Sequence, residues 1–120
     1  PVTEIDEAVP YLLHGPLARA DLREVFPDLG DDVLEAIGVH TYGAVPMSPL
    51  SMVVYIADVI EPGRSHHGVA RLREGAEHAS LEELFADTYV ASLKHIVKRR
   101  RQIHPDTLLV WNSIVAGEDR

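Results

Sequence analysis

Proline and glycine interrupt this sequence at intervals of helical length, and between them apolar residues recur every three or four positions. Strands would require alternation at every second residue, so this spacing predicts helices. The clearest case lies before Pro62-Gly63, where Leu50, Val53, Ala57 and Ile60 share one helical face. We therefore expect an all-α fold, with a single domain over residues 1–120.

Capping residues set the expected helix boundaries. Ser48 and Ser80 are predicted N-caps, the second in a capping box, while Pro49 and Pro105 suit a first helical turn. The expected helices are a short first segment ending at Leu13, followed by about 15–26, 31–40, 49–60, 69–77, 81–98 and a last helix from 105.

Charge and composition exclude several classes of function. Eleven Lys and Arg stand against nineteen Asp and Glu, and the net charge of −8 argues against nucleic acid or an anionic membrane as a partner. No apolar stretch approaches the roughly 20 residues of a membrane span. The absence of cysteine excludes thiolate chemistry and is typical of a cytoplasmic protein, so a metal site would need histidine and carboxylate ligands.

Three polar residues in apolar surroundings are candidate metal ligands. Asp58 stands among the apolar residues 52–60, where a buried carboxylate would need a compensating cation or donor, so it is either a salt-bridge or capping residue or a metal ligand. His14 and His40 each end an apolar run, and each alone is more typical of a structural histidine. Together, two imidazoles and a carboxylate suit iron, manganese or zinc.

Candidate phosphate-binding residues follow the Asp58 helix and the long helix. Arg64 comes directly after the turn Glu61-Pro62-Gly63 and is either a phosphate fork or a solvated loop arginine. The basic run at 98–101 complements the helix dipole, with phosphate attraction as the alternative. His104, between Ile103 and Pro105, is suited to a pocket. The other histidines are interpreted as structural or exposed: His66, His67, His78 and His95.

No phosphate loop, dinucleotide fingerprint, zinc-protease motif or serine-hydrolase elbow occurs. Instead, an ordered set of residues resembles the YqeK-type branch of the bacterial HD-domain metal phosphohydrolases. The matching positions are 12–16, 36–37, 40, 41, 43, 47–48, 55–58, 60–64, 68–69, 72–73 and 103–107. The resemblance implies an all-helical, HD-domain-like bundle that cleaves diadenosine tetraphosphate symmetrically into two ADP at a two-metal centre containing iron, with manganese or zinc as alternatives.

The resemblance also implies roles for individual residues. His14, His40 and Asp58 match metal ligands of the family, and Asp58 and Arg64 are the expected catalytic residues. The expected substrate-binding residues are Thr41, Arg64, Gln102, Ile103, His104, Pro105 and Asp106.

One departure from the family concerns its remaining ligands, an early His and an adjacent His-Asp pair, which have no counterpart here. We therefore expect an N-terminally truncated form of the fold. The expected partners are a dinucleoside polyphosphate or an ADP- or GDP-like nucleotide, the missing N-terminal segment, and a second copy in a homodimer that covers the apolar face left by truncation. The alternative is a catalytically inactive helical fragment or a nucleotide-binding module.

Overall fold

A computed structural model describes residues 4, 13–66 and 68–118. Every regular element among them is a helix, which confirms the all-α prediction. In chain order these are α2 (His14–Val25), α3 (Asp31–Gly38), α4 (Pro49–Ile60), α5 (Val69–Gly75), α6 (Leu81–Lys98) and α7 (Pro105–Glu118). The expected first segment lies largely outside the described residues. None of the described helices is both long and apolar enough to cross a membrane.

The two predicted serine caps are present. The Ser48 side chain accepts a hydrogen bond from the Ser51 backbone N–H at 3.1 Å, and Ser80 accepts one from the Glu83 N–H at 3.2 Å. The end of α3 differs from expectation, since the helix ends two residues early, at Gly38. His40 therefore lies in the turn that follows α3 and not in the helix itself.

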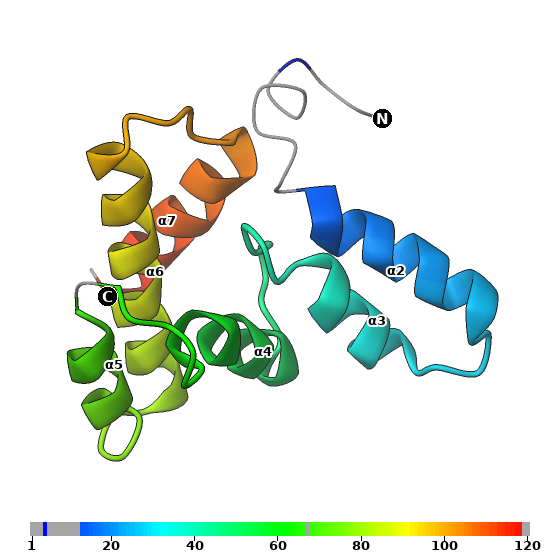
Figure 1. The fold of residues 1–120 in the computed structure, drawn as a ribbon, viewed down its shortest axis with the longest axis horizontal. Coiled ribbons are helices and arrows are strands. Elements are labelled where there is room, and N and C mark those ends of the chain that lie inside the picture. Colours follow the sequence, from blue (N-terminus) through cyan, green and yellow to red (C-terminus); the bar gives the residue numbers. More distant parts are fainter. Residues whose placement is uncertain (1–3, 5–12, 67, 119–120) are drawn as a thin grey trace.

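The helices extend from α2 and α3 on one side of the molecule, through α4, to α5, α6 and α7 on the other side (Figure 1). α2 and α3 lie side by side as a hairpin, α3 contacts α4, and α4 contacts α6, while α5 lies against both α4 and α6. The turn after α3 thus lies between the hairpin and the remaining helices, which brings the predicted site residues of both parts together.

An aromatic cluster forms the centre of the core. Tyr55 of α4 lies 5.4 Å from Phe85 and 5.3 Å from Tyr89 of α6 between ring centroids, and Val110 of α7 packs against them. The Tyr89 hydroxyl donates a hydrogen bond to the Tyr42 carbonyl oxygen at 2.5 Å. Because Tyr89 is buried in α6, this bond fixes the turn after α3 to the core.

Candidate metal and nucleotide site

A pocket of about 620 Å³ collects half of the predicted site residues. Its wall includes His14 of α2, His40 and Thr41 of the turn after α3, Asp58 of α4 and Arg64 of the loop that follows α4. The fold therefore gathers in one cavity five residues that are spread over fifty positions of the sequence.

The two histidines contact each other on the wall of this pocket. Their Nε2 atoms are 2.8 Å apart, and the Nδ1 atom of His40 lies 2.5 Å from the Ile37 carbonyl oxygen. Since a carbonyl oxygen only accepts, the proton of neutral His40 resides on Nδ1, and its Nε2 lone pair points towards His14. A backbone carbonyl orients metal-binding histidines in the same way.

A glycine allows the histidines to come this close. Gly15 is buried where α2 crosses the end of α3. A Cβ atom at this position would lie 3.0 Å from the Gly38 carbonyl oxygen, 3.1 Å from that of Ile37 and 3.2 Å from Nδ1 of His40. Glycine, having no side chain, permits this close backbone approach. The His14-Gly15 dipeptide thus supplies both a candidate ligand and the space that positions it.

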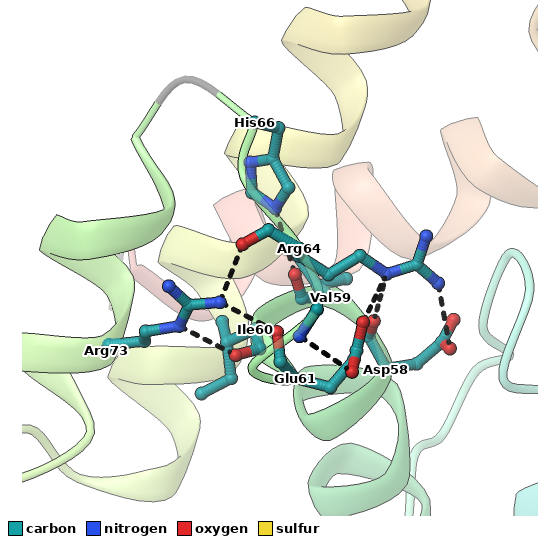
Figure 2. A network of polar contacts seen from close by, with 8 residues as sticks. Asp58, Val59, Ile60, Glu61, Arg64, His66 and Arg73 are labelled. Atoms are coloured by element: carbon teal, nitrogen blue, oxygen red, sulfur yellow. Dashed lines mark hydrogen bonds and ion pairs between the residues drawn. The ribbon is translucent and has the colours of Figure 1, made fainter.

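The predicted burial of Asp58 is wrong. Its side chain is 46% exposed, because α4 buries Ser51, Tyr55 and Ile56 on another side of the helix. Arg64 donates from Nε to the Asp58 carbonyl oxygen at 3.1 Å and from Nη2 to Asp58 Oδ1 at 3.4 Å (Figure 2). The salt-bridge interpretation left open by the sequence is therefore realised in the structure, at an exposed position on the pocket wall.

A second arginine holds the loop that carries Arg64. Arg73 of α5 donates from Nε to the Ile60 carbonyl oxygen at 2.9 Å and from Nη2 to those of Glu61 and Arg64 at 2.7 and 2.8 Å (Figure 2). His66 Nε2 lies 2.9 Å from the Val59 carbonyl oxygen. Sequence reasoning gave Arg73 no role in the site, since its partners are up to 13 residues away and no local pattern marks such contacts.

We expect Arg73→Ala to lower the free energy of unfolding by about 2 kcal/mol, because three hydrogen bonds from a charged donor are lost. The measurement is urea denaturation followed by circular dichroism. Arg23→Ala is the control, since Arg23 makes only an exposed, 3.7 Å ion pair with Asp31 and its removal should leave stability nearly unchanged. Equal effects of the two substitutions would contradict the role of Arg73 in fixing the loop.

The predicted substrate-binding residues 102–106 lie beside the pocket wall and not on it. His104 is buried, stacks on Tyr42 with ring centroids 4.4 Å apart, and accepts a hydrogen bond at Nδ1 from the Asp106 backbone N–H at 3.1 Å. Tyr42 and Thr107 line the pocket, whereas Gln102, Ile103, His104, Pro105 and Asp106 are not part of its wall. Direct contact of this segment with a nucleotide stays a prediction.

Several pocket residues were not anticipated from the sequence. Tyr55, His66, Ser92 and His95 line the cavity, whereas the sequence predicts that both histidines are structural or exposed. Burial raises the pKa of Tyr55 to about 12, a hydrogen bond with Ser92 acts in the opposite direction, and the charge of Asp58 acts in the same direction as burial. The phenol is therefore a neutral group at physiological pH. No local pattern places these residues in a cavity, because the packing of α6 against α4 brings Tyr55, Ser92 and His95 there and the loop after α4 brings His66.

The candidate ligands are of the types that bind divalent metals, but too few of them lie close together within the part of the chain that the structure describes. Across residues 4, 13–66 and 68–118, no three His, Asp or Glu side chains lie close enough together to hold a metal ion. Nε2 of His14 and Nε2 of His40 lie within hydrogen-bond distance of each other, at 2.8 Å, and the Asp58 carboxylate lies on the same pocket wall. Two imidazoles and a carboxylate are donor types that divalent metals prefer, so these three residues stay candidate ligands.

Comparison with known proteins identifies related hydrolases, although no family model matches the chain. It is 35% identical over 104 residues to the symmetrical bis(5'-nucleosyl)-tetraphosphatase of Halalkalibacterium halodurans, and 32% identical over 108 residues to that of Bacillus subtilis. These matches cover 87% and 90% of this chain, but only 55% and 58% of the relatives. The chain therefore spans somewhat more than half the length of these proteins.

The three-dimensional comparison agrees. A crystal structure from Clostridium acetobutylicum, described as a predicted HD superfamily hydrolase involved in NAD metabolism, matches with a TM-score of 0.86 at 33% identity, over 97% of this chain and 61% of that one. The chain has the fold of an HD-superfamily hydrolase. This confirms both the HD-domain-like fold and the resemblance to the symmetrical tetraphosphatases, and the pocket described above is the candidate site of this HD-type fold.

Proposed function

We propose that the intact protein is a metal-dependent hydrolase that splits diadenosine tetraphosphate symmetrically into two ADP. The observation that carries this proposal is the His14–His40 pair on a pocket shared with Asp58 and Arg64, in a chain similar to symmetrical tetraphosphatases. In this reaction a water oxygen bonds to a phosphorus beside the central bridging oxygen. The central P–O–P bond breaks, and each product carries two phosphates.

His14, His40 and Asp58 would hold a divalent ion, iron with manganese or zinc as alternatives, together with donors from the part of the relatives' length that this chain does not cover. Such an ion supplies Lewis-acid polarisation of phosphoryl oxygens and lowers the pKa of bound water. The Ile37 carbonyl keeps the His40 ring in the ligand orientation by holding the Nδ1 proton.

Arg64 is suited to bind the phosphates. Its side chain is 50% exposed on the pocket, and its Nη2 bond to Asp58 is long, at 3.4 Å. Nη1 has no hydrogen-bond partner in the described part of the chain. The guanidinium therefore presents an open donor edge to a phosphate, while Nε keeps it attached to the end of α4. Thr41 lines the same cavity and offers a hydroxyl to a phosphate or ribose oxygen.

Arg64→Ala in the intact enzyme is expected to raise KM for diadenosine tetraphosphate by about tenfold or more, the scale of one charge-assisted contact. Arg64→Lys keeps the charge but loses the bidentate hydrogen bonding of the guanidinium, so it should give a smaller increase in KM. Steady-state kinetics with varied dinucleotide concentration provides the measurement. An unchanged KM in the alanine variant would remove Arg64 from the binding site.

Product analysis tests the activity itself. The purified intact protein is incubated with diadenosine tetraphosphate and added Fe²⁺, Mn²⁺ or Zn²⁺, and the nucleotides are separated by ion-exchange chromatography. We expect ADP as the sole product and loss of turnover after chelation. Formation of ATP with AMP would mean asymmetrical cleavage, and an unreacted substrate under all three metals would contradict the proposal.

A nucleotide-binding module without turnover is the second candidate. It is supported by the contact between Arg64 and Asp58, which occupies one carboxylate oxygen of the candidate ligand, and by the lack of a third close donor among the described residues. Calorimetric binding of ADP by an intact protein that contains metal but hydrolyses nothing would favour this function.

A further inference from the structure

A second hollow, which we call the α5–α6 groove, lies beside the candidate site. It has a volume of about 1380 Å³ and runs along α6 from Leu84 to Arg99, with α5 on its other side. His66, Ala91 and His95 line both this groove and the first pocket. The two hollows therefore adjoin each other along α6, which is seen beside α5 in Figure 1.

The spacing of residues on α6 explains this arrangement. Asp87, Ala91, Lys94 and Lys98 follow one another at intervals of four, three and four residues, so they form one stripe of the helix that faces the groove. Ser92 of the same helix faces the first pocket. α6 thus acts as the partition between the pocket and the groove, and the residues at its edge contact both.

The groove carries positive charge in an acidic protein. Arg71, Lys94, Lys98 and Arg99 line it against two carboxylates, Glu74 and Asp87, whereas the whole chain has a net charge of −8. All four cationic side chains are exposed, and none forms an ion pair with a carboxylate in the described part of the chain. A groove with more cations than carboxylates attracts small anions more strongly than the acidic surface around it does.

We propose that the α5–α6 groove binds the phosphate-rich second half of the dinucleoside substrate, the nucleoside diphosphate that leaves. This inference rests on the proposed function. A substrate cut at its centre has a nucleoside at each end. With its central phosphates at the His14–His40 pair, one nucleotide lies in the first pocket and the other extends past His66 and His95. The adjoining groove receives it, and the lysines and arginines neutralise its phosphates.

The test compares the intact wild-type enzyme with the Lys94→Gln/Lys98→Gln variant. We expect KM for diadenosine tetraphosphate to rise by about tenfold in the variant, with kcat little changed, because charge-assisted phosphate contacts are lost. Calorimetry with ADP should give two sites per chain for the wild type and one for the variant. Arg23→Gln, outside both hollows, removes one positive charge, half the change in the double variant, and should keep the wild-type KM.

The outcomes separate the possible failures. A wild-type enzyme that does not hydrolyse the dinucleotide overturns the proposed function and with it this assignment. Hydrolysis with the same KM in the double variant and the wild type overturns the groove assignment alone. An unchanged KM with loss of inorganic tripolyphosphate binding would assign the groove to a separate anion and not to the substrate. If the variant is unstable, the wild type supplies the test. Its KM should rise with salt more steeply than the screening of the single Arg64 contact predicts, and a rise no steeper than that overturns the groove assignment.

Discussion

Replacing His40 by alanine is expected to lower kcat/KM for diadenosine tetraphosphate by about a hundredfold or more, since even the loss of a group that orients a metal ligand costs about 10- to 100-fold. His40 combines two features on which the candidate centre depends. Its Nδ1 is held by the Ile37 carbonyl oxygen, and its Nε2 lies 2.8 Å from that of His14. Alanine removes one imidazole nitrogen and leaves His14 without its neighbour.

Two measurements on the intact protein check this result: steady-state kinetics at saturating metal, and metal content by elemental analysis of the same sample. Asp28→Ala, an exposed substitution in the turn between α2 and α3, is the surface control and should retain both activity and metal. If His40→Ala kept its metal and its kcat/KM, His40 would serve only to hold the end of α3 through Ile37.

Most of the fold could be predicted from the sequence because local chemistry decides it. The Ser48 and Ser80 caps and the prolines at 49 and 105 mark helix starts that the structure confirms. The end of α3 could not be placed as well, because the residues after Gly38 carry no strong stop signal and a continued helix was the simplest extrapolation.

The site was predicted less completely because its contacts join distant segments. Residue type and the family resemblance identified His14 and His40, but their 26-residue separation contains nothing that predicts a 2.8 Å approach. Apolar neighbours suggested that Asp58 is buried, yet each helical residue is rotated by about 100° from the one before, so sequence neighbours face different surroundings. The contacts of Arg73 could not be predicted from the sequence because its partners are backbone carbonyl oxygens, which every residue possesses.

Gly15 has no room for a side chain, so replacing it is expected to change both the stability of the protein and the placement of the histidine pair. Gly15→Ala should lower the free energy of unfolding by about 2 kcal/mol, because the new Cβ would lie 3.0 and 3.1 Å from the Gly38 and Ile37 carbonyl oxygens, and overpacking typically costs about 1–3 kcal/mol. Both neighbours are backbone atoms, so no rotamer change relieves the contact. α2 must instead move away from α3 and take His14 with it.

Gly117→Ala is the matched control for this substitution. Gly117 also lies in a helix, but a Cβ there would meet nothing within 4 Å, so alanine should stabilise the protein by up to about 1 kcal/mol through its higher helix propensity. Urea denaturation measures both variants, and titration with Co²⁺ followed by its visible absorption measures the histidine pair. We expect Gly15→Ala to weaken Co²⁺ binding and Gly117→Ala to leave it unchanged. Equal stabilisation by the two alanines would show that α2 does not depend on this close approach, and the placement of His14 against His40 would then need another cause.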